Sequence, residues 1–287
     1  MRSFIPAYSM KTPRDVAEAL AILAAEPGTW RPFAGGTDLM VLLEAGKLPD
    51  RNYLNIWNLN ELRGIEVTDE AISLGALTTY TGVQRNPILR AEFPMLCQAA
   101  AETGGLAIQN RGTLGGNIVN ASPAADSPPA LLAYDAELEL ISLRGSRRVA
   151  YRDFHTGYKQ MKIEAHELLS RVHMLRSKRK LHQYYRKVGT RKAQAISKVC
   201  FAGMAEIEGE VIKEIRIALG SIAPIPLRCV RTEAALRGQR IENTSSGLKV
   251  FEHEIAPIDD IRSTRDYRLR VSLNLLEDFL SQLGRFN

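Results

Sequence analysis

Two glycine-rich segments carry the side chains and backbone best suited to bind a ligand: residues 33–38 (FAGGTD) and residues 112–117 (GTLGGN). Paired glycines let a backbone approach a ligand closely, because no Cβ intervenes. Consecutive N–H groups in such a turn can surround an anion, and a following helix adds the positive end of its dipole. The side chains of Thr37, Asn117 and Ser122 add hydrogen-bonding groups. One such pair usually marks a turn, whereas two in one chain could hold a pyrophosphate from two sides.

The spacing of these glycines does not identify the anion that they would bind. Neither segment has the G-x-G-x-x-G spacing of a Rossmann fold or the Gly-Lys-Ser/Thr of a P-loop. The chain also shows no Ser-His-Asp arrangement and no cluster of metal-ligand residues. The residues by themselves therefore leave an anion site and two structural turns as alternatives.

The first glycine segment is expected between a short strand at residues 30–34 and a helix at residues 39–43. An earlier helix is expected to begin at Thr12 as its cap, with Pro13 in the first helical position and Asp15 in the first turn, and to end at Pro27.

The rest of the chain is expected to contain hairpins, helices and further strands. We expect a hairpin at residues 65–74, helices between 79 and 102, and a second hairpin at 137–151 turned by residues 144–146. Further strands are expected at 168–175, 183–188, 198–207 and 211–219. Leucines at 269, 273, 276, 280 and 283 predict a long amphipathic helix. The basic residues 176–180 are interpreted as a solvated connector.

Composition narrows the class of protein. The net charge of +6 favours an ordinary basic surface or a small anionic ligand, with nucleic-acid binding through residues 176–191 as a rival. Three scattered cysteines argue against a disulfide framework and against a cysteine-bound iron–sulfur cluster. We expect a reducing, cytoplasmic location, with no export signal and no membrane span.

Several motifs together resemble one family, the FAD-binding medium subunits of the molybdenum hydroxylases, which include xanthine dehydrogenase and carbon monoxide dehydrogenase. The resemblance rests on these segments in this order: 34–38 (AGGTD), 113–118 (TLGGNI), 121–126 (ASPAAD), 153–157 (DFHTG), 186–189 (RKVG), 191–197 (RKAQAIS), 220–226 (GSIAPIP), and 262–264 (RST) followed by 267–268 (YR). It covers nearly the whole chain.

The resemblance implies an α+β fold and its division into domains. A two-part FAD-binding domain of the vanillyl-alcohol-oxidase (PCMH) type would occupy residues 1–177, with subdomains at about 1–57 and 58–177. A smaller α+β C-terminal domain would occupy residues 178–287.

The resemblance also implies the residues that would hold FAD. One segment would wrap the pyrophosphate: Pro32, Phe33, Ala34, Gly35, Gly36, Thr37, Asp38 and Leu39. The other would hold it from the opposite side: Thr113, Leu114, Gly115, Gly116 and Asn117. Asp126 would lie near the adenosine part, and Lys187 and Leu169 near the isoalloxazine ring. The plainer alternatives are a helix cap for Asp126, a water-facing strand lysine for Lys187 and a core position for Leu169.

The resemblance implies an electron-transfer subunit with no catalytic residue of its own and no metal, because substrate hydroxylation would take place on a molybdopterin-binding large partner. His155 is accordingly interpreted as structural. Electrons would pass from the 2Fe–2S clusters of a small partner to FAD, and then to NAD or another acceptor. The alternatives are a stand-alone flavin oxidoreductase and a scaffold that has lost FAD.

Overall fold

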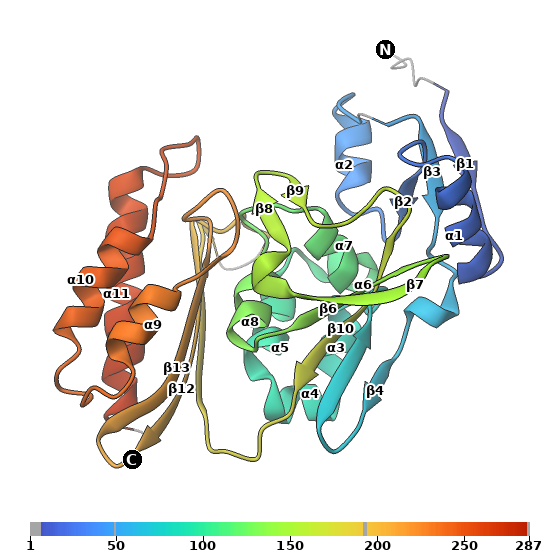
Figure 1. Ribbon diagram of the computed structural model, residues 1–287. Helices are drawn as coiled ribbons and strands as arrows, with labels where there is room; N and C mark the ends of the chain where they lie inside the picture. The colour runs from blue at the N-terminus through green and yellow to red at the C-terminus, as the bar shows by residue number, and fades with distance from the viewer. Residues whose placement is uncertain (1–6, 49, 192–193, 286–287) are drawn as a thin grey trace.

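The computed structural model describes residues 7–48, 50–191 and 194–285, arranged as three sheets with their helices and one short two-stranded ribbon (Figure 1). Residues 1–6, and Lys192 and Ala193 of the 191–197 motif, lie outside the described residues. No described helix is both long and apolar enough to cross a membrane.

The N-terminal part contains a small parallel sheet in the order β1-β3-β2. Its strands are β1 (Ser9–Lys11), β2 (Arg31–Phe33) and β3 (Asn52–Asn55), and its helices are α1 (Val16–Ala25) and α2 (Leu39–Glu44). The expected cap of the first helix was wrong. Asp15 occupies the N-cap and accepts a hydrogen bond from the amide of Glu18, so the helix begins at Val16 rather than beside Thr12.

The central part is a five-stranded antiparallel sheet in the order β4-β5-β10-β6-β7. Its strands are β4 (Ile65–Val67), β5 (Ala71–Gly75), β6 (Glu137–Ser142), β7 (Gly145–Ala150) and β10 (Leu168–Leu175). Both expected hairpins are present, but the second turns at residues 143–144, because Gly145 already pairs with Ser142. The strand expected at 168–175 is confirmed.

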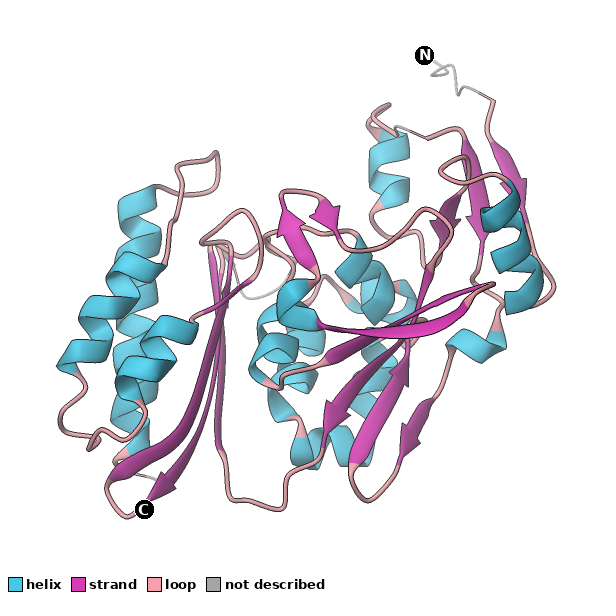
Figure 2. Cartoon of the chain, in the orientation of Figure 1, coloured by secondary structure: helices cyan, strands magenta, loops and turns pink. Residues whose placement is uncertain are grey.

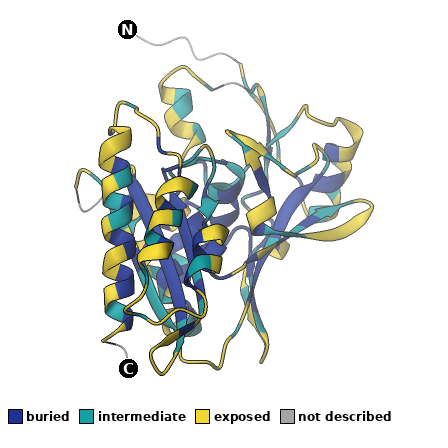
Figure 3. Ribbon diagram, turned by 60° about the vertical axis from the view of Figure 1, so that its left-hand side comes forward, coloured by how far each residue is buried: buried dark blue, intermediate teal, exposed yellow. Residues whose placement is uncertain are grey.

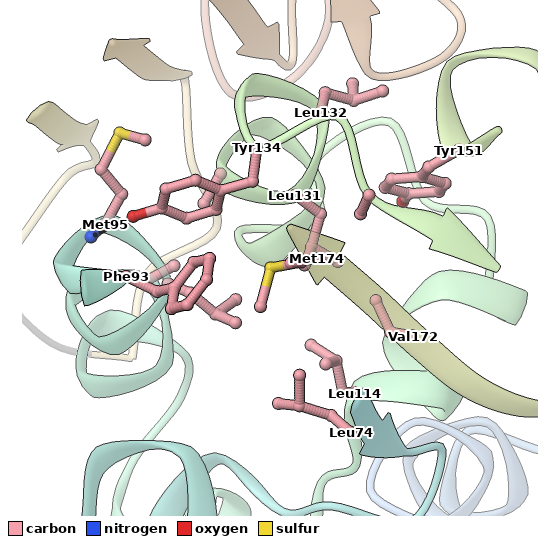
Figure 4. Packing of buried hydrophobic residues seen from close by; sticks show 14 of the residues in the cluster. Leu74, Phe93, Met95, Leu114, Leu131, Leu132, Tyr134, Tyr151, Val172 and Met174 are labelled. Carbon is pink, nitrogen blue, oxygen red and sulfur yellow. Dashed lines mark hydrogen bonds between the residues drawn. The ribbon is translucent and has the colours of Figure 1, made fainter. Parts of the chain in front are cut away.

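Short helices cover one face of the central sheet (Figure 2). They are α3 (Tyr80–Arg85), α4 (Pro87–Glu92), α5 (Pro94–Glu102), α6 (Leu106–Arg111), α7 (Leu114–Val119) and α8 (Ser127–Ala133), with the ribbon β8 (His155–Gly157) and β9 (Gln160–Met161) beside them. Alternate residues of the strands, such as Leu74 and Val172, point into the core between sheet and helices, where Figure 4 shows them together with Leu114.

The C-terminal part is a four-stranded antiparallel sheet with three helices on its outer face. Its elements are β11 (His182–Val188), β12 (Val199–Glu208), β13 (Val211–Gly220), β14 (Leu227–Arg228), α9 (Val230–Leu236), α10 (Ser245–Glu254) and α11 (Arg265–Leu283). The long leucine helix is confirmed: Leu276, Leu280 and Leu283 are buried, and Figure 3 shows the buried inner side of these helices.

Helix α8 joins the central and C-terminal parts. All seven of its residues are buried, and it lies against β12 and β13 on one side and α5 on the other. The segment 176–180 is largely the solvated connector that was expected, since residues 177–180 are exposed, but Arg176 is partly buried in a two-pronged ion pair with Glu92 at 2.6 and 2.8 Å.

Arg228 fixes this junction from the C-terminal side. Its guanidinium donates to the carbonyl oxygen of Leu132 at 2.7 Å and to Asp135 at 2.5 Å, and it also pairs with the buried carboxylate of Glu233. The Glu233 carboxylate additionally accepts from the amide of Ile217 at 2.7 Å, and burial raises the pKa of Glu233.

Replacing Arg228 with Gln should lower the free energy of unfolding by about 3–5 kcal/mol, because Glu233 would keep a buried charge without its partner. The control is Arg237→Gln, which removes a half-exposed ion pair with Glu214 and should cost about 1 kcal/mol or less. Urea denaturation of the intact chain measures both. Equal effects of the two substitutions would contradict this interpretation of the junction.

Candidate cofactor site

The two glycine segments meet through their backbones. A Cβ placed on Gly35 would lie 1.8 Å from the carbonyl oxygen of Arg111 and 3.3 Å from the amide nitrogen of Gly112. That space exists only because residue 35 has no side chain. Gly36 has a φ of +74°, a conformation that glycine adopts readily and other residues rarely do.

The amides of the first segment are available to a ligand. The N–H groups of Gly35, Gly36, Thr37 and Asp38 donate no hydrogen bond to any described residue, although Gly36 accepts one from the amide of Met40. Four consecutive free donors at the carboxyl end of β2, just before α2, form the kind of turn that binds an anion. The remaining predicted residues of this segment flank the turn. Pro32 and Phe33 are the last two residues of β2, Ala34 follows them, and Leu39 is the first residue of α2.

The amides of the second segment are already used inside the protein. The amide of Leu114 donates to Thr78, that of Gly115 to Ala76 and that of Asn117 to Thr113, at 2.8–3.0 Å. The Gly116 amide donates to the side chain of Thr113, which caps α7.

Gly115 is therefore a packing glycine. Its Cβ would lie 2.7 Å from the Cβ of Ala76, while the Cβ of Gly116 would meet the Thr113 hydroxyl at 2.8 Å. The side-chain oxygen Oδ1 of Asn117 is buried and has no hydrogen-bond partner among the described residues. This segment therefore offers a ligand one unsatisfied hydrogen-bond acceptor, on Asn117, and a backbone without side chains at Gly115 and Gly116. It does not offer a series of free amide donors.

Asp126 and Lys187 form a buried ion pair. Lys187 Nζ lies 2.7 Å from Asp126 Oδ2 and also donates to the carbonyl oxygen of Glu102 at 2.8 Å. The two side chains are only 6 % and 10 % exposed, so Lys187 does not face water. Asp126 occupies the cap position of α8 but makes no side-chain capping bond, because its carboxylate turns toward Lys187.

The second carboxylate oxygen of Asp126 is a free acceptor. Oδ1 is buried without a partner among the described residues. Burial raises the pKa of Asp126 to about 6, an effect that Lys187 partly offsets. Because this pKa lies above that of an unfolded chain, the folded state holds the proton more tightly, and this group lowers stability as pH rises from about 4 to about 6.

The ion pair restricts where FAD could lie. Asp126 was expected beside the adenosine part and Lys187 beside the isoalloxazine ring, but the two side chains touch. They would therefore face the same part of the cofactor. Leu169 lies on β10, is 6 % exposed and belongs to the core of the central sheet, which is the plainer of its two interpretations.

His155 has a structural contact. Its Nε2 lies 3.0 Å from the carbonyl oxygen of Ile118 in α7, and burial lowers its pKa, so the neutral ring donates this bond. Sequence reasoning missed a second histidine contact, in which His173 bonds to Ser73 and to Glu139, each at 2.7 Å. These three residues lie on the paired strands β5, β10 and β6. A nucleophilic serine site needs free backbone N–H groups nearby, and here the hydrogen bonds between the strands already occupy those groups. The contact therefore cross-links the sheet.

The residues fit a flavin dinucleotide better than a metal ion. Free amides at Gly35–Asp38 suit a phosphate, and the lone acceptors on Asn117 and Asp126 suit hydroxyl or amine groups of a ligand. Among the described residues, no group of three or more His, Cys, Asp or Glu side chains is placed to hold a metal. The three cysteines are free thiols.

Comparison with known proteins agrees with this chemistry. Residues 6–174 match the model of the FAD binding domain in molybdopterin dehydrogenase, and residues 183–283 match that of the CO dehydrogenase flavoprotein C-terminal domain. A xanthine dehydrogenase FAD-binding subunit from Escherichia coli is 32 % identical over 276 residues, which cover 93 % of this chain and 92 % of the relative. A nicotinate dehydrogenase FAD-subunit from Eubacterium barkeri is 35 % identical and covers 88 % of each chain.

A solved structure extends the match to three dimensions. A chain of carbon monoxide dehydrogenase from Hydrogenophaga pseudoflava superimposes with a TM-score of 0.91 at 25 % identity, and 96 % of each chain is covered. The expected α+β fold, with an FAD-binding domain followed by a C-terminal domain, is thereby confirmed, and so is FAD as the cofactor.

Replacing Gly35 with Ala should weaken FAD binding at least about tenfold, because the new methyl group forces the first turn away from the backbone of Arg111. The control is Gly82→Ala in α3, whose Cβ would meet its neighbours at ordinary distances of 3.4 and 3.5 Å. Titration of the apoprotein with FAD, followed by flavin fluorescence, measures both variants. Wild-type affinity in Gly35→Ala would show that the turn does not shape the site.

Proposed function

The chain belongs to the family of FAD-binding subunits of the molybdenum hydroxylases, and we propose from this premise that it carries electrons through one bound FAD inside a larger oxidoreductase. The observation that supports this most directly is the first glycine turn, with four free amides held against the second glycine segment. We propose that residues 32–39 and 113–117 enclose the FAD pyrophosphate, with Asp126, Leu169 and Lys187 contacting other parts of the cofactor.

Bound FAD would supply the two-electron redox chemistry, and the chain would position it and set its electrostatic surroundings. The Lys187 ammonium would favour the negative charge of reduced flavin if the ring lies beside it. Asp126 opposes this effect when ionised and ceases to oppose it when protonated, below a pH of about 6. The site would also exclude bulk water, because both side chains are nearly buried.

The partners of the chain follow from the relatives. The relatives described above are named as FAD-binding subunits, and a subunit is part of a larger enzyme. We propose a molybdopterin-binding large subunit that hydroxylates the substrate and a small subunit with 2Fe–2S clusters that delivers the electrons. NAD or another acceptor, such as oxygen or a quinone, is the proposed final acceptor of the electrons, and the cytoplasm is the proposed location. Residues 1–177 and 178–287 are the proposed domains.

Co-expression with the genes for the two partner subunits tests the function. The purified complex should contain one FAD for each copy of this chain, and addition of the reducing substrate should bleach the iron–sulfur absorbance before or together with the flavin band. Added NAD, oxygen or a quinone should then restore the flavin band, and the compound that does so is the acceptor. A chain that purifies alone with FAD and oxidises a small alcohol would contradict the proposal, as would a complex without flavin.

Asp126→Asn should raise the midpoint potential of bound FAD by about 30–60 mV at a pH near 7.5, because it leaves the Lys187 charge uncompensated beside the flavin. The double variant Asp126→Asn/Lys187→Met, which lacks both charges, should return the potential toward that of the wild type. Near pH 5 the difference between Asp126→Asn and wild type should vanish, since wild-type Asp126 is then protonated.

The matched control is Glu208→Gln, which removes a carboxylate from an exposed ion pair with Lys213 and should leave the potential unchanged. A weaker FAD affinity without any change of potential would place the ion pair beside the adenosine part instead of the ring. Redox titration of the flavin absorbance measures every variant.

A further inference from the structure

Two arginines and a tryptophan form a cluster that neither the motifs nor the family resemblance includes. The guanidinium carbon of Arg111 lies 4.0 Å from the centre of the Trp57 ring, and that of Arg63 lies 4.5 Å from it. Arg63 also donates a hydrogen bond to the carbonyl oxygen of Trp57. Cation–π contacts of this kind orient a guanidinium while leaving its N–H edge free.

The two positive charges lack a negative counterpart. Neither Arg63 nor Arg111 forms an ion pair within the described part of the chain, although many of its other arginines do. Burial, and then the charge of Arg111, lowers the pKa of Arg63, which shows that the two cations disfavour each other. An anion between or beside them would relieve that repulsion.

The cluster lies next to the first glycine turn. Strands β2 and β3 are parallel neighbours, and the amide of Ile56 donates to the carbonyl oxygen of Phe33 at 3.0 Å. Gly35 and Trp57 therefore follow the carboxyl ends of adjacent strands, where ligands of open parallel sheets bind. Arg111 reaches the same edge from α6, because its backbone oxygen occupies the space that a side chain on Gly35 would need.

We propose that Arg63 and Arg111, held by Trp57, bind the pyrophosphate of FAD together with the free amides of Gly35–Asp38; this rests on the proposed function. A diphosphate carries the negative charge that the cluster lacks, and guanidinium groups bind phosphate oxygens through paired, charge-assisted hydrogen bonds. The cluster would thereby select the dinucleotide FAD over riboflavin, which has the same ring system but no phosphate.

The test compares FAD with riboflavin on the full-length apoprotein. Arg63→Gln and Arg111→Gln should each weaken FAD binding about tenfold or more, since each removes a charged partner of the phosphates. The affinity of both variants for riboflavin should stay unchanged. Their affinity for FAD should fall less steeply with added salt than that of the wild type. Inorganic pyrophosphate should compete with FAD on the wild type and compete less well on both variants.

Arg51→Gln is the matched control. Arg51 is also an arginine stacked on an aromatic ring, at 5.3 Å from the centre of Tyr8, but it precedes β3 and so lies at the opposite, amino end of that strand. It should not change FAD affinity. In a Trp30→Phe background, whose remaining tryptophan is Trp57, FAD should quench tryptophan fluorescence, which reports binding at the cluster directly.

Each outcome decides the proposal. Unchanged FAD affinity in both Gln variants, with FAD still bound by the wild type, would overturn the arginine cluster while leaving the proposed function in place. Equal losses of affinity for FAD and for riboflavin would mean that the cluster only supports the fold. That result would also overturn the proposal that the cluster binds the pyrophosphate. A wild-type chain that binds neither FAD nor pyrophosphate would overturn both proposals.

Discussion

The candidate site depends on a contact between two pieces of backbone. Gly35 lies so close to the carbonyl of Arg111 that a methyl group has no room between them. This contact joins the small parallel sheet to the helices that cover the central sheet, and it places the free amides of the first turn beside α6 and α7. Because backbone cannot move aside as the end of a flexible side chain can, the geometry of the turn is tied to the packing of both parts.

A second constraint comes from α8, which is buried between the central and C-terminal sheets. Its N-cap residue is Asp126, which residues of β11 contact: Lys187 pairs with the carboxylate, and Tyr185 donates to the backbone oxygen at 3.1 Å. The C-terminal part thus contributes to the candidate site directly. A change in how β11 packs would alter the charge balance at the site as well as the stability of the junction.

Charge is arranged unevenly around the site. At the Asp126 end, one cation and one anion nearly cancel in a buried setting, so small changes of protonation alter the local field strongly. At the Trp57 end, Arg63 and Arg111 form no ion pair with any described residue, and this edge is more exposed. A ligand with a charged middle and a neutral, redox-active ring matches this distribution, and FAD is such a molecule.

The sequence by itself determined the local features of this protein. Glycine pairs, hairpins, the strand at 168–175 and the leucine helix follow from residue type and spacing, since neighbours along the chain dictate them. The motifs likewise identified the family and FAD. Asp15 displaced Thr12 as helix cap because both residue types can cap, and the choice between two nearby caps depends on how the helix packs.

Only the tertiary structure decided which groups are free to act. The amides of residues 114–117 donate hydrogen bonds to Ala76, Thr78 and Thr113, whereas those of residues 35–38 donate to no described residue, although both segments look alike in sequence. The pairing of Asp126 with Lys187, 61 positions apart, and the gathering of Arg63 and Arg111 on Trp57 likewise have no local signal. The reason is physical: whether a donor or charge is satisfied depends on distant segments that pack against it, and spacing along the chain does not record them.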